Sequence, residues 1–552
     1  MTEATSAASP SKRNVVLYRN GSVYTAADPF ATAMLVDGDT VAWVGSEQAA
    51  SSIADSTMEI IDLRGSLVAP GFVDSHVHLT ETGIALDSLQ LGQVRSARQL
   101  LDAVQAAPRN GPVLGHGWDE STWADPTLPT PDELERAAGG RHVYLARADV
   151  HSALVSRSLT AAAGLADLDG FAPGGHLKRA AHSAARRATR DLPEEALRGY
   201  QRRALAEAAA NGYVAAAEMG APHIGGVADL RLAAAWNTGG NGSQAVPEVL
   251  PYWGELALNQ EHAQSILDGL GVRVRGLAGD LNIDGSIGSR TAALRADYSD
   301  AAGERGSLYL SVDEAAAHLA ACSMLGIQGG FHIIGDAGLD TALAALDLAA
   351  ADVGEQRIRS AGHRFEHVEI ADSKAVARLA HYSVTVSSQP GFDAAWGAAG
   401  SLYEQRLGSR STGMNAFASF YSAGVPITFG SDSPVTPLRP WASVRACLEH
   451  HNNDQRISAR AAFLGHTRAG WRAAKYHNPM AGQLVPGAPA SFAVWEVEEL
   501  MVQVADGRVQ SWSTDPRART PLLPALDTGT DPVCLQTVRD GAELYSSPAL
   551  RA

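Results

Sequence analysis

The chain has 552 residues, of which 45% are hydrophobic and 19% are charged, and its formal net charge is −16. These proportions are ordinary for a soluble globular protein, and the length suits a large barrel with an accessory domain better than one small core. The acidic balance argues against nucleic acid or an anionic membrane as the main partner.

The first residues and the cysteines indicate the compartment. Residues 1–13 are small and polar and lack the apolar core of a signal peptide, so we expect them to be disordered. The three cysteines, Cys322, Cys447 and Cys534, are too far apart to suggest a disulfide framework or a Cys-x-x-Cys metal site. No apolar run has transmembrane length. Together these features favour a reducing, cytoplasmic location.

Residues 14–67 read as short strands separated by turns. The dipeptides Asn20-Gly21 and Asp37-Gly38 lie between apolar runs and are typical hairpin turns. We therefore predict that this segment is the N-terminal part of a small β domain.

The next run, Val68 to Leu79, is an apolar strand that carries His76 and His78 at its end. Residues two apart on a strand share a face, so both imidazoles can reach one point. A lone His-x-His is more often a pair of surface histidines. Here the strand is apolar and further histidines follow in similar settings, so the pattern favours a metal site.

Between residues 68 and 482, short apolar strands alternate with long stretches of helical composition. With the strand before His76 there are eight candidates, which predicts an α/β fold with a TIM-like (β/α)8 barrel. The region near 246–311 fits poorly and is interpreted as an inserted hairpin and loop region. The other candidate strands are Pro112–His116, His142–Ala146, Tyr213–Ala217, Gly330–Ile334, Arg364–Val368, Val384–Ser388 and Pro426–Gly430.

Strand-like patterns return from residue 483. Leu484–Trp495 and Leu500–Val504 are followed by a turn at Asp506-Gly507 and a short strand at Val509–Trp512. We expect residues 483–552 to supply the C-terminal part of the first β domain and a tail. Both chain ends would then build one composite β-sandwich domain beside the barrel.

Metal-binding residue types recur at the ends of later strands. His332, His367 and Asp432 each lie at or near the C-terminal end of a predicted barrel strand, where barrel active sites form. Imidazoles with a carboxylate match the ligand chemistry of Zn²⁺, and Mn²⁺, Fe²⁺ or Co²⁺ are compatible. Asp432 beside a metal-bound water can also shuttle a proton, or it can cap the helix that follows.

These motifs, taken in order, resemble the amidohydrolase superfamily. They resemble in particular its YtcJ-like branch, amidohydrolase family 3, which includes N-substituted formamide deformylases. The resemblance extends from the N-terminal β domain to about Trp495 and implies a metal-dependent hydrolase with a TIM-like barrel and a composite β-sandwich. The matching segments are Pro70–His78, Gly117–Trp123, Asp284–Ala292, His332–Asp336, Arg364–His367, Gln389–Pro390, Arg406–Gly408 and Gly430–Pro434.

The resemblance implies a ligand set of His76, His78, His332, His367 and Asp432. Two metals in this superfamily are usually bridged by a carboxylated lysine or by an acidic residue on the fourth strand. The fourth strand here ends at Glu218 and has no lysine, so Glu218 is a candidate ligand, with a supporting or salt-bridging carboxylate as the alternative. Four residues before Asp284-Gly-Ser, where relatives carry a lysine, stands Asp280. One ion or two are both compatible with this pattern.

Other residues are assigned from the same resemblance. His151 matches a histidine of the relatives and could contact the substrate or polarise its carbonyl, or be a structural loop histidine. Arg290 could hold a substrate anion or form a surface ion pair. Asp336 could orient His332 or begin a helix. The remaining substrate-binding candidates, of which the tryptophans could equally be core aromatics, are Trp118, Trp123, Gln389 and Trp396.

The function expected from this reading is hydrolysis of a C–N bond in a small amide, such as an N-substituted formamide or another N-acyl amine. A divalent metal, with Zn²⁺ preferred, would activate water, and Asp432 would move the proton. The alternatives are the same barrel acting on an ester or cyclic amide or in decarboxylation or isomerisation, and a catalytically silent barrel that binds a small molecule. No nucleic-acid or membrane partner is expected, and a homodimer is a reasonable prior.

Overall fold

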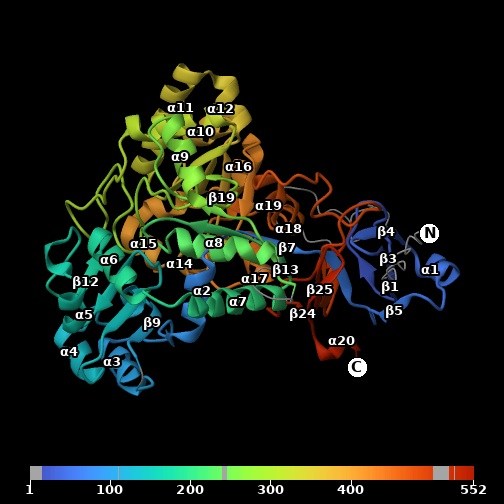
Figure 1. Cartoon of the computed structure of the whole chain (residues 1–552), viewed down its shortest axis with the longest axis horizontal. Helices are drawn as coiled ribbons and strands as arrows, with labels where there is room; N and C mark the ends of the chain where they lie inside the picture. The colour runs from blue at the N-terminus through green and yellow to red at the C-terminus, as the bar shows by residue number, and fades with distance from the viewer. Residues whose placement is uncertain (1–14, 110, 239–244, 502–520, 528, 552) are drawn as a thin grey trace, which may run out of the picture.

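The computed structural model describes residues 15–109, 111–238, 245–501, 521–527 and 529–551. The predicted disordered N-terminus, the turn at Asp506-Gly507 and the strand after it lie outside these residues. The fold is mixed α/β with several sheets. Figure 1 shows β1, β3, β4 and β5 (blue) at one end of the molecule, with β24 and β25 (red) next to them toward the middle. At the other end lie β9 and β12 with the helices α3 (Ala97–Ala106), α4 (Pro131–Ala137), α5 (Arg157–Ala162) and α6 (Arg179–Thr189).

A path of parallel strands runs through the middle of the molecule. The strand of the His-x-His pair, β7, pairs in parallel with β13, which also pairs with β14 and β15. Strands β16 to β20 form a five-stranded parallel sheet in chain order. A parallel bridge between Val77 and Ser433 joins the end of β7 to the segment after β20. The strand bounds are β7 Phe72–Val77, β13 Tyr213–Gly220, β14 Glu248–Val249, β15 Tyr252–Trp253, β16 Gly276–Leu277, β17 Gln328–Ile333, β18 Arg364–His367, β19 Thr385–Ser388 and β20 Ile427–Phe429.

Helices lie between these strands in the chain, as a β/α alternation requires. Their amphipathic stretches bury an apolar stripe against the parallel strands, and several begin with a serine, asparagine or aspartate cap. The helices of this part are α2 Leu79–Asp87, α7 Glu194–Ala210, α8 Val227–Ala235, α9 Gln260–Leu270, α10 Val312–Leu325, α11 Asp336–Val353, α12 Glu355–Ala361, α13 Ser373–His381, α14 Pro390–Trp396, α15 Leu402–Leu407, α16 Phe417–Ala423, α17 Pro440–Glu449, α18 Ala459–Gly465 and α19 Arg468–Ala473.

Two of the strands predicted for the barrel belong to a different sheet. The segments predicted at 112–116 and 142–146 form β9 (Val113–Trp118) and β10 (Val143–Arg147). They pair in a separate five-stranded sheet with β8 (Leu89–Gln90), β11 (Ser152–Val155) and β12 (His176–Lys178). β10 packs one hydrophobic cluster on each face, so its pattern cannot be told from that of a barrel strand.

The region at 246–311 was wrongly predicted to be an insertion. It contains β14, β15 and β16, which take positions in the parallel path. Each of these strands is two residues long, too short to show a period of its own. The consequence for function is large, because the loop after β16 carries Asp280.

The β strands from the two chain ends share one sheet. Its order is β2 (Ser22–Val23), β6 (Leu67–Pro70), β21 (Phe492–Glu496), β24 (Val533–Arg539) and β25 (Ala542–Ser546). Val68 of β6 lies opposite Val494 of β21 in an antiparallel pair. A second sheet is built from β4 (Thr40–Gly45), β3 (Ala33–Asp37), β1 (Val15–Arg19) and β5 (Glu59–Asp62).

Gly71 divides the long apolar run of residues 68–79 between two sheets. Before it, β6 belongs to the sheet shared by the chain ends; after it, β7 joins the parallel path. A Cβ at Gly71 would lie 2.3 Å from Cγ1 of Val214, so no side chain fits there. β7 is buried along its whole length because both of its faces are covered.

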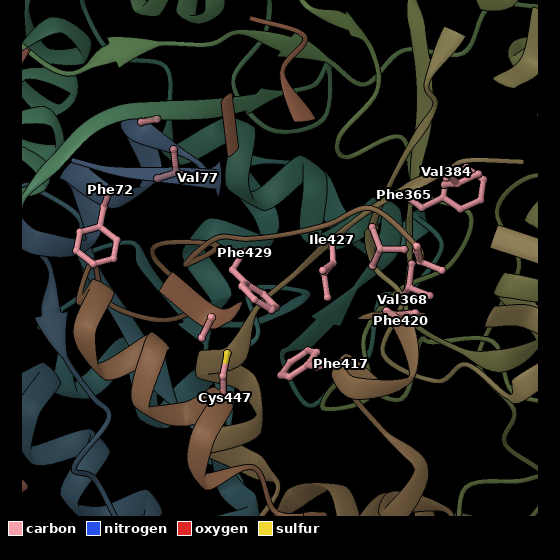
Figure 2. Packing of buried hydrophobic residues seen from close by; sticks show 14 of the residues in the cluster. Phe72, Val77, Phe365, Val368, Val384, Phe417, Phe420, Ile427, Phe429 and Cys447 are labelled. Atoms are coloured by element: carbon pink, nitrogen blue, oxygen red, sulfur yellow. The ribbon is translucent and has the colours of Figure 1, made fainter. Parts of the chain in front are cut away.

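Aromatic packing fixes the end of β7 that lies away from the histidines. The ring centroid of Phe72 lies 5.1 Å from Trp441, 5.4 Å from Phe463 and 5.7 Å from Trp495. Figure 2 shows Phe72 and Val77 on β7 in the same cluster as side chains from β20 and α16. Burial of each large side chain contributes roughly 2–3 kcal/mol.

Among the helices of the described residues, none is long and apolar enough to cross a membrane.

Candidate metal centre

Four histidines from three strand ends converge in the interior. His76 lies on β7, His78 follows it in extended backbone, His332 lies on β17 and His367 ends β18. The ring centroids are 5.3 Å apart for His76 and His78, 5.0 Å for His76 and His367, and 4.4 Å for His332 and His367. All four are buried. The structure thus brings together the four imidazoles predicted from the sequence.

Asp432 lies beside the first pair of histidines. Its Oδ1 is 3.4 Å from Nε2 of His76 and 3.4 Å from Nε2 of His78. The next helix, α17, begins at Pro440, so Asp432 does not cap it. This geometry fits the predicted role of a carboxylate ligand or proton carrier and removes the capping alternative.

Asp280 is the carboxylate that lies between the histidines. Its Oδ1 is 3.6 Å from Nε2 of His76 and 3.6 Å from Nδ1 of His332, and its Oδ2 is 3.1 Å from Nε2 of His78. Sequence reasoning named Asp280 only as a replacement for a lysine of the relatives. The available signal was an acidic residue at a position where relatives carry a lysine.

The side chains present fit a divalent cation. At this centre, two sets of three residues each have ligand atoms that all lie within 4.8 Å of one another: His76, Asp280 and His367, and His76, His78 and Asp432. Within the described part of the chain, four buried atoms of these residues lack a hydrogen-bond partner: His76 Nε2, His78 Nδ1, His367 Nε2 and Asp280 Oδ1. Each such atom costs about 1–3 kcal/mol when nothing binds it. Nitrogen and carboxylate donors suit Zn²⁺ and related ions.

Neighbouring side chains fix the tautomers of two histidines. His76 donates from Nδ1 to Oε2 of Glu366 at 2.8 Å, and His367 donates from Nδ1 to Oε1 of Gln389 at 2.7 Å. In each ring the lone pair is therefore on Nε2, which is the unpartnered atom. Burial alone would raise the pKa of Glu366, but Arg364 and His76 lower it to about 2, so it is ionised. Gln389, predicted to bind substrate, instead orients a histidine.

The backbone of the centre is held in unusual conformations. His367, Val368 and Asp432 have φ of 68°, 50° and 52°, a region that costs non-glycine residues roughly 1–3 kcal/mol. On a regular strand, Glu366 and His367 would point to opposite faces. The left-handed backbone at His367 allows both side chains to reach His76.

Glu218, the predicted fourth-strand ligand, has a different partner. Its Oε2 accepts a hydrogen bond from the backbone N–H of Leu79 at 2.7 Å. Burial raises the pKa of Glu218 to about 7. Neither group of converging ligand atoms includes it. Glu218 therefore anchors the start of α2 next to His78, which is the supporting role that the sequence left open.

His151 and Trp396 lie near the centre. The ring of His151 is 4.9 Å from that of His332, and Val150 before it has φ of 49°. Trp396 lines a narrow cavity of about 20 Å³ that also reaches His332, His367 and Asp432. Both residues therefore lie close to the converging histidines, and their contact with a substrate stays a prediction.

The other candidates lie elsewhere. Trp118 and Trp123 are core residues whose Nε1–H groups donate to the carbonyls of Leu145 and Val94 at 2.8 and 3.0 Å. Arg290 pairs with Asp300 at 2.7 Å. Asp336 accepts from the backbone N–H of Arg295 and of Ala337 at 2.9 and 3.0 Å, so it orders the start of α11 and does not bind His332.

A cavity of about 420 Å³ opens next to the histidines. His78, Asp280 and His151 are among its lining residues. Arg186 and His182, on α6 (Arg179–Thr189), line it as well. The size suits a small organic molecule. Sequence reasoning missed Arg186 and His182, because nothing in a helix of alanines and arginines marks the residues that will line a cavity.

Comparisons with known proteins give a consistent picture. A sequence model described as the amidohydrolase family matches residues 59–545. The chain is 25% identical over 524 residues to the protein LONG AFTER FAR-RED 3 of Arabidopsis thaliana, covering 87% of this chain and 86% of that protein. It is 23% identical over 469 residues to the putative amidohydrolase YtcJ of Bacillus subtilis, and 23% identical over 464 residues to the N-substituted formamide deformylase of Arthrobacter pascens. Each of these two alignments covers 78% of this chain and 83% of the relative.

The fold is also found among solved structures. An uncharacterized metal-dependent hydrolase from Pyrococcus horikoshii superimposes with a TM-score of 0.68 at 24% identity. The superposition covers 88% of this chain and 98% of that one. This similarity establishes a shared fold.

Proposed function

Because this chain belongs to the amidohydrolase family, we propose that it is a metal-dependent hydrolase that cleaves the C–N bond of a small amide. The observation that carries the proposal is the buried set of four histidines and two aspartates beside a cavity of about 420 Å³. The named activity of one relative, an N-substituted formamide deformylase, supports an N-formyl or other N-acyl amine as the substrate.

The same proposal extends to the architecture. The bridge between Val77 and Ser433, and the contact of β15 with β16, support closure of the parallel strands into a (β/α)8 barrel. The pairing of β6 with β21 supports a composite β-sandwich built from residues 14–67 and 483–552. In this arrangement the histidines lie at the carboxyl ends of barrel strands.

Six residues would hold the metal. These would be His76, His78, His332 and His367 with the carboxylates of Asp280 and Asp432. Zn²⁺ is the preferred ion for this donor set, and the site suits one ion or two. When bound, such a cation polarises the amide carbonyl and makes water acidic enough to ionise near neutral pH.

Side chains of the protein then transfer the proton. Asp432 accepts the proton of the attacking water and returns it to the amide nitrogen as the C–N bond breaks. The products are a carboxylic acid and an amine, with the water oxygen on the acyl carbon. His151, whose ring lies 4.9 Å from that of His332, would donate a hydrogen bond to the carbonyl oxygen. The apolar side chains around Trp396 restrict access of bulk water.

The test combines metal analysis with a substrate panel. Purified protein is analysed for metal and assayed for amine release from N-formyl and N-acetyl alkylamines, with the matching esters and lactams in parallel. We expect metal in the wild-type protein and turnover of amides, and the loss of both in the His76→Ala/His78→Ala variant. Metal-loaded, folded protein that releases no amine would contradict the proposal, and turnover of esters or lactams alone would change the bond assigned to it.

A further inference from the structure

Arg186 presents a buried positive charge to the cavity beside the proposed metal centre. It lies on α6 and lines the cavity together with His78 and Asp280. Its Nη2 donates to the carbonyl of Val150 at 2.8 Å, and its Nε has no hydrogen-bond partner. Among the residues that the structure describes, no carboxylate forms an ion pair with it.

Two other arginines near this cavity, Arg179 and Arg190, are already paired with carboxylates. Arg179 donates to both oxygens of Asp169 at 2.7 and 2.8 Å. Arg190 holds both oxygens of Glu81 at 2.8 and 2.7 Å. Burial alone would raise the pKa of Glu81, but Arg190 and Arg186 lower it to about 2. Glu81 therefore lowers the net positive charge near Arg186, but both of its oxygens accept hydrogen bonds from Arg190 instead.

The histidines beside Arg186 do not add positive charge at neutral pH. Burial lowers the pKa of His223 to about 4, and it also lowers the pKa of His182, whose Nε2 is 2.8 Å from the hydroxyl of Tyr144. A buried cation without a counterion costs several kcal/mol. The guanidinium has five N–H donors, of which one is used by the protein. Two of the others match the two oxygens of a carboxylate.

We infer that Arg186 binds a carboxylate group of the substrate, so that the substrate class is an N-acyl amine with a carboxylate, such as an N-acyl amino acid. This inference rests on the proposed function, because the amide must reach the metal centre while the carboxylate reaches α6. A single monovalent cation suits a monoanion. A phosphate dianion would have only Arg186 as its cationic partner. Both of its negative charges would then share the cavity with the carboxylates of Glu81 and Asp169.

Binding of two uncleavable probes tests this assignment without depending on turnover. The probes are racemic N-methanesulfonylleucine and N-methanesulfonyl-isoamylamine, which differ by the carboxylate. Isothermal titration calorimetry on metal-loaded wild-type protein should give at least a tenfold lower Kd for the carboxylate probe. Arg186→Gln should remove that preference and leave the Kd of the neutral probe within about threefold. Arg186→Lys, which keeps the charge without the paired N–H groups, should keep part of it.

Arg187→Gln is the matched control. Arg187 is the next residue on α6 and is exposed, so the variant removes the same charge without touching the cavity. It should keep the full preference for the carboxylate probe. Melting temperature and metal content report whether Arg186→Gln is folded, and the Arg186→Lys variant carries the comparison if it is not.

Two results overturn the inference. In the first, wild-type protein binds the carboxylate probe no more tightly than the neutral probe, or binds neither. In the second, Arg186→Gln still prefers the carboxylate probe. A protein that discriminates between the probes through Arg186 but hydrolyses no amide would keep this inference and reject the proposed function. The two can therefore fail separately.

Discussion

His367 and Gln389 are joined by a hydrogen bond of 2.7 Å from the imidazole Nδ1 to the amide Oε1, and both side chains are buried. His367 ends β18, and Gln389 follows β19, the adjacent strand. One strand of the sheet thus orients the ligand atom of its neighbour. The Nε2 of His367, opposite the bonded nitrogen, has no partner among the described residues and faces the proposed metal centre.

Removing this hydrogen bond should weaken metal binding. In Gln389→Ala the ring of His367 is free to rotate and to change tautomer, so we expect a loss of roughly 10–100-fold in metal affinity. Competition with a chelator, followed by elemental analysis, measures the change. Gln389→Glu, which keeps an acceptor, should recover most of the affinity. Equal affinities in wild type and Gln389→Ala would show that the bond does not orient the ring.

Asp280 should matter more for metal than Glu218. Asp280→Asn removes the negative charge shared by His76, His78 and His332, and we expect at least a ~100-fold loss of metal affinity, beyond the range typical of supporting residues. Glu218→Gln keeps an acceptor for the N–H of Leu79 and should hold its metal. Asp268→Asn, at an exposed position on α9, controls for net charge. If Glu218→Gln lost more metal affinity than Asp280→Asn, Glu218 and not Asp280 would be the carboxylate that the histidines share.

Gly430 sets the distance between β7 and the loop that carries Asp432. A Cβ at this position would lie 2.5 Å from the backbone nitrogen of His76 and 2.9 Å from Oδ1 of Asp74. We expect Gly430→Ala to displace His76, to lower stability by about 1–3 kcal/mol and to reduce metal content. Gly413→Ala is the control, because nothing lies within 4 Å of a Cβ there. Full metal content in Gly430→Ala would show that the centre tolerates this shift.

Acid should destabilise the fold through His318, away from the centre. Its Nδ1 accepts from the N–H of Ala257 at 3.1 Å and its Nε2 donates to the carbonyl of Leu277 at 2.9 Å, and burial lowers its pKa to about 4. Between an unfolded pKa of about 6.5 and the folded value, the unfolded chain binds the proton and the folded chain does not. Stability from this group is therefore present above about pH 6.5 and falls as the pH drops toward 4.

The size of this effect can be measured with a variant. His318→Asn keeps an acceptor for Ala257 but cannot be protonated in this range. The free energy of unfolding of this variant should be lower than that of wild type at pH 7.5. Denaturant unfolding should show that this deficit is about 2 kcal/mol smaller at pH 5. His477→Asn, the same substitution at an exposed position, is the control for the exchange of histidine for asparagine. A deficit that stays constant with pH would mean that His318 is not held neutral.

Much of the fold was predictable where the signal is local. A strand of several apolar residues that ends in histidine or aspartate can be read from the chain alone, and such strands carry His76, His332 and His367. The two-residue strands β14, β15 and β16 could not be read, because they form only where a neighbouring strand supplies the hydrogen bonds. The strands β9 and β10 were found but assigned to the wrong sheet, since burial on both faces looks the same in any sheet.

By itself the sequence determined which residue types could bind a metal and which strands present them, because the two-residue period of a strand is a property of neighbouring residues. Only the tertiary structure decided that Asp280 lies among the histidines while Glu218 bonds to Leu79. It also decided that Arg186 has no carboxylate partner among the described residues. The physical reason is that hydrogen bonds and ion pairs depend on distances of a few ångströms between residues far apart in the chain. His76 and Glu366 are 290 positions apart in the sequence, yet their side chains lie 2.8 Å from each other. No local sequence pattern indicates such a contact.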